Sequence, residues 1–306
     1  MIRYGSVCSG IEAATQAWHL LGWEPVFFSE IDDFPRAVLQ HHYPDVPCHG
    51  DFTTIGEDDY GSIDLLVGGT PCQSFSIAGL RGGMADERGN LALEYLKLAQ
   101  RKRPRWVVWE NVPGVLSSNG GRDFGAFLGG LVDCGYGWAY RICDAQYWGV
   151  AQRRRRVFVV GYLGDWRRAA AVLFERESLS GNPAPSREAR KEATTPAGER
   201  IAAFDKQRLG QYGNGEVSST LAARDYKDAT DLVAEELSVR RLTPTEAERL
   251  QGFPDCFTQI PYRNKPADKC PDGPRYKALG NSFAVPVVRW IGERIQAVEG
   301  LVNAED

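Results

Sequence analysis

The sequence of 306 residues lacks the features that mark a membrane protein, a disulfide-bonded protein or a zinc protein. No run approaches the roughly eighteen consecutive apolar residues that a membrane-spanning helix needs. The seven cysteines are an odd number and no two are spaced as C-x-x-C, which disfavours a disulfide framework and a four-cysteine zinc site. The first residues lead into an apolar, strand-like segment without the pattern of a signal peptide. We therefore expect a reduced, soluble, cytoplasmic protein that does not enter a membrane.

The sequence also lacks an excess of basic residues. Its net charge is −4 and its pI is near 5.7, which argues against indiscriminate polyanion binding, because that usually requires a basic domain. Two basic runs, residues 101–105 and 153–156, could still form a local basic surface. We interpret the first of them as a solvated face.

The three glycines of a dinucleotide-binding fingerprint are missing as well. In the turn at residues 7–13, Glu12 and Ala13 stand where glycine is expected, which counts against pyrophosphate binding. The turn still offers backbone N–H groups to a ligand. Glu30 ends the next predicted strand and suits the two hydroxyls of a ribose, and Asp51 could lie near an adenine amino group. These features indicate an adenosine-containing cofactor but do not distinguish NAD from S-adenosylmethionine.

Short apolar runs alternate with helical patterns through the first half of the chain. The predicted strands are residues 4–8, 26–29, 64–68, 106–110, 140–143 and 157–162, and the predicted helices are residues 12–21, 34–41, 91–101 and 124–134. This alternation predicts βαβ units and therefore an α/β fold with a mostly parallel sheet.

The alternation stops after Gly164. Residues 178–200 resemble a linker, and residues 201–240 a small second domain with little core. Further on, Thr243, Pro244 and Glu246 form the pattern of a capping box at a helix start. A final amphipathic helix is predicted from four apolar residues at helical spacing, which are Val288, Ile291, Ile295 and Val298.

Cys72 lies where a buried strand gives way to a loop, in the sequence Thr70-Pro71-Cys72-Gln73. Open α/β sheets bind their ligands outside the carboxyl ends of the strands, so Cys72 is a candidate nucleophile. The alternative is a cysteine that packs as a small hydrophobic residue. The long glycine-rich segment that follows, residues 74–90, is typical of a lid or a binding loop.

Charged residues at other strand ends could complete such a site. Glu110 ends a buried strand at the same edge and could protonate or hydrogen-bond a ring nitrogen, unless it only caps the next turn. In the run before strand 157–162, alternation points Arg154 and Arg156 to one side and Arg153 and Arg155 to the other. One pair could enter the site while the other meets solvent or phosphate. An arginine near the thiol would increase its thiolate fraction.

Two further clusters are open to more than one interpretation. Asn281, just before the last predicted helix, could cap that helix or contact a ligand. His41, His42, Cys48 and His49 are close together, but they meet no ligand-spacing rule, so we predict no metal site.

Five segments, taken in order, resemble the DNA (cytosine-5)-methyltransferases. They are Ser9-Gly10, Pro71-Cys72-Gln73, Glu110-Asn111-Val112, Gln152-x-Arg154-x-Arg156 and Gly280-Asn281-Ser282. The ordered set is far more specific than any one motif. The resemblance covers about residues 1–163 and 239–298. It implies a Rossmann-like, S-adenosylmethionine-dependent fold with a smaller target-recognition domain.

The resemblance also implies a division of the chain. A catalytic and cofactor-binding domain would span residues 1–163, and a target-recognition domain with a hinge residues 164–272. Residues 273–306 would return to the catalytic domain. One departure is that Cys8 and the pair Glu12-Ala13 occupy places where the family usually has an aromatic residue and two glycines.

The chemistry of the family explains these residue types. C5 of cytosine is a poor nucleophile until a thiolate adds to C6 of a base flipped out of the duplex. By resemblance, Cys72 supplies that thiolate, and Glu110 engages N3 and the exocyclic amine. Arg154 and Arg156 would hold the base and the geometry of the site, one of them at the O2 edge. No motif identifies the base that removes the C5 proton.

The remaining site residues follow from the same resemblance. The residues expected to bind S-adenosylmethionine are Ser9, Gly10, Ile11, Glu30, Ile31, Asp51, Phe52, Asn281 and Ser282. The candidates for binding DNA are Gln73, Ser76, Arg81, Arg88, Arg153, Arg155, Thr220, Leu221, Arg224 and Lys227. Among the latter, Arg224 could read a guanine and Lys227 could meet a phosphate.

The sequence thus predicts an enzyme that methylates C5 of cytosine within a specific site of double-stranded DNA. We expect a monomer, with a restriction endonuclease as a candidate partner. The alternatives are a tRNA cytosine-5 methyltransferase, a nucleotide-cofactor oxidoreductase, and a DNA-binding relative without catalysis. The sequence specifies neither the recognised site nor any preference for hemimethylated DNA.

Overall fold

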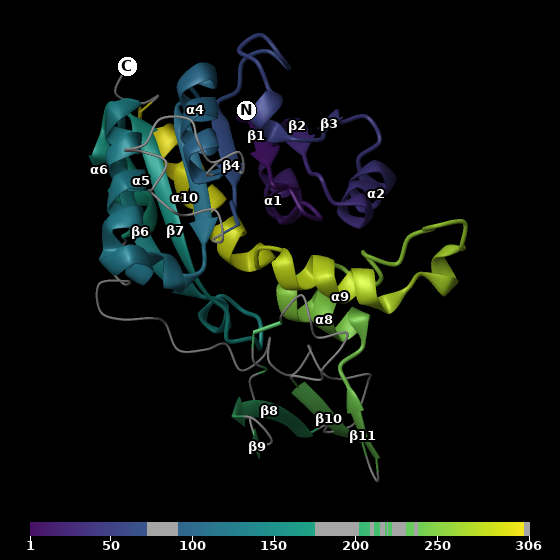
Figure 1. Ribbon diagram of the computed structural model, residues 1–306. Helices are drawn as coiled ribbons and strands as arrows, with labels where there is room; N and C mark the ends of the chain where they lie inside the picture. The colour runs from purple at the N-terminus through teal and green to yellow at the C-terminus, as the bar shows by residue number, and fades with distance from the viewer. Residues whose placement is uncertain are drawn as a thin grey trace.

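The computed structural model describes residues 1–71, 91–174 and 238–302, together with 202–208, 211–214, 218, 220, 221 and 231–235. Figure 1 shows a large sheet with its helices and a smaller sheet beyond α8 and α9. Several predictions lie outside the described residues, namely those on Cys72, Gln73, Ser76, Arg81, Arg88, Arg224, Lys227 and the linker 178–200.

The large sheet has seven strands in the order β3-β2-β1-β4-β5-β7-β6. Their bounds are β1 Arg3–Val7, β2 Glu24–Ser29, β3 Cys48–His49, β4 Leu65–Gly68, β5 Trp106–Asn111, β6 Tyr136–Asp144 and β7 Arg155–Leu163. Pairing is parallel from β3 to β5 and antiparallel for β5–β7 and β7–β6. The predicted α/β fold with a mostly parallel sheet is therefore confirmed.

The core lies on both faces of this sheet, because alternate residues of a strand point to opposite sides. In β5, Trp106 and Val108 join one buried cluster, whereas Val107 and Trp109 join the other. Strands buried on both faces show continuous apolar runs, which is why the central strands could be predicted from sequence.

The helices cover the two faces in separate groups. Their bounds are α1 Ala13–Trp18, α2 Asp33–His42, α4 Leu91–Lys102, α5 Arg122–Asp133, α6 Trp166–Leu173, α8 Pro244–Gln251, α9 Asp272–Asn281 and α10 Val285–Val302. Short 3-10 helices are η1 His19–Leu21, η2 Phe52–Thr54, η4 Pro113–Gly121, η5 Ala145–Tyr147 and η7 Ala267–Lys269. Buried residues of α1, α6 and α10 belong to one cluster, and those of α4 and α5 to the other. Among the described helices, none is long and apolar enough to cross a membrane.

Helix α6 is absent from the sequence-based prediction, which ended the regular pattern at Gly164. Asp165 caps it by accepting a hydrogen bond from the backbone N–H of Arg167 at 2.9 Å. Its buried residues pack against β6, β7 and α10, so this segment continues the packing of the large sheet. The predicted division into domains at residues 163 and 164 stays a prediction.

The smaller sheet is antiparallel, in the order β11-β10-β8-β9. Its strands are β8 Ala202–Arg208, β9 Gln211–Asn214, β10 Asp231–Glu235 and β11 Ser238–Arg241. The chain then enters α8 through the predicted capping box, which is confirmed, since Thr243 and Glu246 bond each other's backbone N–H. In α10 the four predicted apolar residues are all buried, which confirms the final helix.

The basic run at residues 101–105 is more than a solvated face. Lys102 donates to the backbone carbonyls of Glu57, Asp59 and Gly61. Arg105 pairs with Asp64 at 3.1 Å and with Glu299 in α10 at 2.8 Å. The run ties the end of α4 to neighbouring segments.

Candidate active site

The segment that leads from β4 towards Cys72 is held by side chains of β5. Thr70 is buried, and its hydroxyl accepts a hydrogen bond from Trp109 Nε1 at 3.0 Å. The carbonyl of Thr70 accepts a second one from Asn111 Nδ2 at 2.9 Å. The main chain is therefore fixed two residues before the predicted nucleophile, which itself lies outside the described residues.

Glycine is needed at position 69 because of close neighbours. A Cβ there would lie 2.9 Å from Phe283 Cε1 and 3.0 Å from Glu110 Oε2. Both distances are shorter than ordinary carbon contacts, so a side chain would displace the ring or the carboxylate. Gly69, three residues before Cys72 in the sequence, thus lies directly against Glu110.

Glu110 occupies the end of β5 as a nearly buried carboxylate, 12% exposed. Its Oε1 lies 3.0 Å from Nε of Arg156, whose side chain is 15% exposed. Burial raises the pKa of Glu110 above its ordinary value, although Arg156 and Arg154 act in the opposite direction. A raised pKa favours the protonated form of a carboxyl group, which can donate a hydrogen bond to a ring nitrogen.

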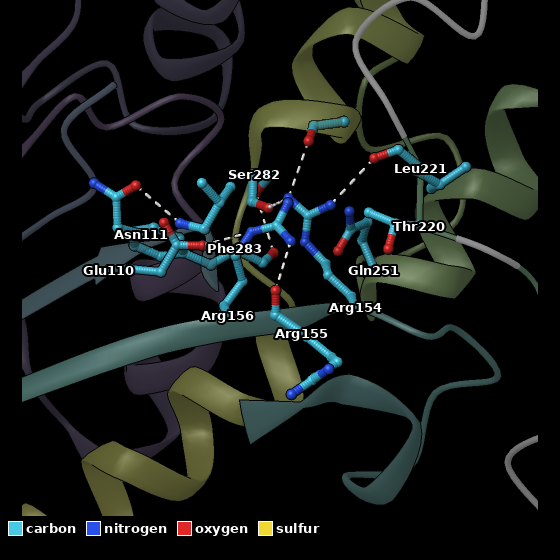
Figure 2. Close-up of polar contacts among 12 residues, drawn as sticks. Glu110, Asn111, Arg154, Arg155, Arg156, Thr220, Leu221, Gln251, Ser282 and Phe283 are labelled. Atoms are coloured by element: carbon cyan, nitrogen blue, oxygen red, sulfur yellow. Dashed lines mark hydrogen bonds and ion pairs between the residues drawn. The ribbon is translucent and has the colours of Figure 1, made fainter. Parts of the chain in front are cut away.

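Arg154 lies deeper than Arg156 and joins three segments, as Figure 2 shows. Its Nη2 donates to the carbonyls of Gly280 at 2.9 Å and Ser282 at 2.6 Å. Its Nη1 donates to the carbonyl of Leu221 at 3.2 Å. The side chain is 2% exposed, and burial lowers the pKa of Arg154 to about 9, so it remains charged at neutral pH. The pair was predicted to hold the base and the geometry, and the contacts of Arg154 fit the second role.

The alternation predicted for the arginine run agrees with the exposure of its members, since Arg153 and Arg155 are exposed. The hydroxyl of Thr220 donates to the carbonyl of Arg153 at 2.5 Å. Leu221 is buried in the core and meets Arg154 through its carbonyl. These contacts join the Thr220-Leu221 segment to the arginine run, while its DNA-binding role stays a prediction.

At the ends of β1 and β2, Glu30 is held by three backbone amides. Its Oε2 accepts from the N–H of Gly10 at 2.8 Å, and its Oε1 from those of Ile31 at 2.8 Å and Asp32 at 2.9 Å. Ile31 is 71% exposed, and a Cβ on Gly10 would meet no atom within 4 Å. A fixed carboxylate beside an exposed apolar side chain and open backbone is suited to a ribose and an adenine ring.

The other predicted cofactor residues differ in what they can offer. Asp51 is exposed and caps η2 by accepting from the N–H of Thr53 at 3.0 Å. Ile11, Phe52 and Ser282 have buried side chains, so they can offer a ligand mainly backbone groups. The Ser9 hydroxyl donates to backbone carbonyls, one of them that of Ser29, and accepts from the Ser29 N–H.

Asn281 is the exposed last residue of α9, and α10 begins only at Val285. The interpretation of Asn281 as the cap of the last helix is therefore wrong. Its place beside Ser282, whose carbonyl holds Arg154, leaves the ligand-contact interpretation as a prediction.

The histidine cluster has partners of other kinds. His42 Nε2 lies 2.7 Å from the carbonyl of Phe257. The two ring nitrogens of His49 lie 2.8 Å from the hydroxyl of Tyr60 and 2.7 Å from that of Thr54. Within the part of the chain that the structure describes, no three His, Cys, Asp or Glu side chains gather as a metal site.

The fold is that of known methyltransferases. The structure of S. pombe Dnmt2 methyltransferase superimposes with a TM-score of 0.71 at 18% identity, over 98% of this chain and 99% of that one. Entamoeba histolytica methyltransferase EhMeth gives a TM-score of 0.60 at 17% identity, over 97% of this chain and 98% of that one. At such identities the likeness shows the fold alone.

Sequence comparison identifies the family. The model of the C-5 cytosine-specific DNA methylases matches residues 2–197 and 176–297, and the chain belongs to this family. Type II methyltransferase M.NlaX of Neisseria lactamica is 33% identical, over 91% of this chain and 90% of that protein. M1.ScrFI of Lactococcus lactis subsp. cremoris is also 33% identical, over 89% of this chain and 72% of that protein.

Another relative carries a different name. The DNA N-6-adenine-methyltransferase of Escherichia phage P1 is 36% identical over 95% of this chain. The chain spans only 61% of the length of that relative. More than a third of the phage protein thus lies outside the match, so its name does not specify what the matched part does.

Proposed function

We propose that the protein transfers a methyl group from S-adenosylmethionine to C5 of cytosine within a specific site of double-stranded DNA. The observation that carries this proposal is the Glu110–Arg156 pair, which lies against Gly69 at the strand end leading to Cys72. An acid and a thiol nucleophile are the combination that addition to a pyrimidine ring requires, and Cys72 follows Gly69 by three residues in the sequence. The family is one whose members use S-adenosylmethionine.

The residues at the ends of β1 and β2 fit that methyl donor. Glu30 would hold the ribose hydroxyls, Ile31 would pack on the adenine, and the open backbone at Gly10 would admit the nucleoside. Asp51 and Asn281 are exposed and could reach the adenine and methionine ends respectively. When bound, S-adenosylmethionine supplies an electrophilic methyl carbon.

The proposed reaction begins at the thiolate of Cys72. A sulfur–carbon bond forms at C6 while Glu110 hydrogen-bonds N3, which relieves the negative charge that develops on the ring. C5 would then be nucleophilic and would take the methyl group from the bound donor, whose sulfur–methyl bond would break to leave S-adenosylhomocysteine. A base removes the C5 proton, the electron pair re-forms the C5–C6 double bond, and the thiolate of Cys72 leaves.

Arg156 and Arg154 would divide the work of the motif. Arg156 holds the Glu110 carboxylate at 3.0 Å and lies close enough to the surface to approach the O2 edge of the base. Arg154 would act as a positioning residue, because its Nη1 and Nη2 donate to three backbone carbonyls. We expect a monomer in the cytoplasm, with a restriction endonuclease as its candidate partner.

The product base distinguishes this proposal from its rivals. The purified protein is incubated with labelled S-adenosylmethionine and either duplex DNA or tRNA, and the nucleosides are separated by mass spectrometry. We expect 5-methylcytosine from duplex DNA. N6-methyladenine would favour the activity named for the phage P1 relative, label in tRNA alone would favour an RNA substrate, and no label would favour a protein without catalysis.

The covalent step has its own test. A duplex with 5-fluorocytosine at the methylated position should trap the protein with S-adenosylmethionine, since the fluorine prevents removal of a C5 proton. Cys72→Ser should give neither trapping nor methylation, and a serine variant that methylates at near wild-type rate would refute the mechanism. Bisulfite sequencing of the modified DNA then gives the recognised site.

A further inference from the structure

Glu12 is a buried acid with an unusual backbone conformation. Its φ is 63° and its ψ is 60°, which is the left-handed region that residues with side chains rarely adopt. Cys8 and Gly10 in the same turn also have positive φ, at 49° and 55°. Such conformations persist only where surrounding contacts fix them, and they are frequent at ligand-binding sites.

The Glu12 carboxylate supplies contacts of that kind. Its Oε1 accepts from the hydroxyl of Ser6 at 2.5 Å. Its Oε2 accepts from the backbone N–H of Thr15 at 3.0 Å and from the Thr15 hydroxyl at 2.7 Å. Since the Thr15 hydroxyl gives its single proton to Glu12, the hydroxyl of Tyr4 donates to Thr15, at 2.7 Å. Glu12 is 1% exposed, so these donors replace solvent entirely.

The same turn is fixed on its other side by the predicted ribose ligand. The backbone N–H of Glu12 donates to the carbonyl of Ser9 at 3.0 Å. Gly10, which follows Ser9, donates its N–H to the Glu30 carboxylate at 2.8 Å. Residues 9 and 10 are therefore held between the backbone N–H of Glu12 and the carboxylate of Glu30.

We propose that Glu12 is a positioning residue for the methyl donor, because its carboxylate fixes the turn at residues 8–12 that would admit the nucleoside. This inference rests on the proposed function. Glycine, which the family usually has at this position, makes the left-handed conformation accessible but does not enforce it. In this chain the side chain enforces it, through the start of α1 and the end of β1.

Three variants separate positioning from general stability. Glu12→Gly permits the left-handed backbone but removes all three accepted hydrogen bonds. Glu12→Gln can keep them in part, with its oxygen towards Thr15 and its amide donating to Ser6. Asp165→Ala is the matched control, since it removes the capping acid of α6, whose contacts are with β6, β7 and α10.

Affinity for S-adenosylmethionine and for S-adenosylhomocysteine is measured by calorimetry on the full chain without DNA. If the turn without its carboxylate occupies the binding conformation about one tenth of the time, the Kd rises about tenfold. For Glu12→Gly we expect this tenfold rise in Kd and a higher KM for the methyl donor. We expect little change in kcat or in the KM for DNA. Glu12→Gln should stay within about threefold of wild type, and Asp165→Ala should bind like wild type.

Hydrogen exchange provides a measurement that does not depend on activity. Amides of residues 8–15 should exchange faster in Glu12→Gly and in Ser6→Ala, which removes a single donor to the carboxylate. Wild-type cofactor affinity or unchanged exchange in a folded Glu12→Gly would overturn the inference, and if that variant fails to fold, Ser6→Ala decides. Failure of the wild-type protein to bind S-adenosylmethionine would instead refute the proposed function.

Discussion

Replacing Arg154 by methionine tests whether one buried guanidinium holds the site together. The change leaves the carbonyls of Leu221, Gly280 and Ser282 without their donor. A buried polar group left unpaired costs about 1–3 kcal/mol. Three such groups give at least about 3 kcal/mol, from which the relieved burial of a charge subtracts. We expect a net loss of about 2–4 kcal/mol in the free energy of unfolding.

The assay is unfolding in urea, followed by tryptophan fluorescence, with thermal unfolding beside it. In a chain of this size each kcal/mol corresponds to about 2–4 °C in Tm, so the melting temperature should fall by about 4–16 °C. The carbonyls of Gly280 and Ser282 flank Asn281, so the affinity for S-adenosylmethionine should fall as well.

Two further variants define what the guanidinium contributes. Arg154→Lys keeps the charge but replaces the planar guanidinium by a single ammonium group, which cannot reach all three carbonyls. It should therefore recover less than half of the unfolding free energy that Arg154→Met loses. Arg155→Met removes an exposed arginine from the same run and should change stability by no more than about 0.5 kcal/mol. If Arg154→Met is as stable as Arg155→Met and binds the methyl donor normally, Arg154 has no positioning role.

Two more predictions concern the surroundings of Cys72. Because burial raises the pKa of Glu110, its stabilising effect is full below the ordinary pKa and is lost as pH rises through the raised one. Between the ordinary and the raised pKa, wild type should therefore lose stability as pH rises, so the unfolding free energy of Glu110→Gln should increase relative to that of wild type when urea unfolding is repeated across this pH range. The kcat of the variant should fall about 10²-fold or more. A difference in unfolding free energy that does not change with pH would contradict the raised pKa. Gly69→Ala should cost about 1–3 kcal/mol and most of the activity, because its Cβ would lie 2.9 Å from Phe283 and 3.0 Å from Glu110. Gly125→Ala, within α5 and with no atom near the added carbon, should be neutral or stabilising, and equal effects of the two would refute the packing argument.

Much of the large sheet could be predicted from the sequence because its central strands are buried on both faces. β4 and β5 read as continuous apolar runs, and their predicted bounds agree with the structure within one residue. β6 was predicted too short because it is an edge strand in which buried residues are interrupted by partly exposed and exposed ones, so it lacks a continuous apolar run. The eight-residue α6 was missed because two arginines and three alanines leave it few large apolar residues.

The site could be predicted where it depends on side chains that end parallel strands. Glu30 and Glu110 lie at one edge of the sheet, as parallel pairing requires. The partners of Arg154 could not be predicted, because backbone carbonyls occur at every residue and carry no signal in the sequence. For Glu12 the sequence showed only a missing glycine, and neither the left-handed backbone nor the buried carboxylate could be inferred from that absence.

The two arginines of the motif Gln152-x-Arg154-x-Arg156 therefore have different roles, which the sequence of the motif does not distinguish. Arg156 pairs with Glu110, the proposed catalytic acid, so a change of Arg156 should alter the chemistry. Arg154, two residues earlier on the same side, meets only main-chain oxygens from segments far apart in the chain. Since a carbonyl accepts from any donor of suitable geometry, the role of Arg154 depends on the forked shape of its guanidinium and on its place between three segments. The same reasoning applies to Glu12, whose carboxylate accepts from Ser6 and Thr15 while its backbone N–H holds the carbonyl of Ser9, next to the Gly10 N–H that donates to Glu30.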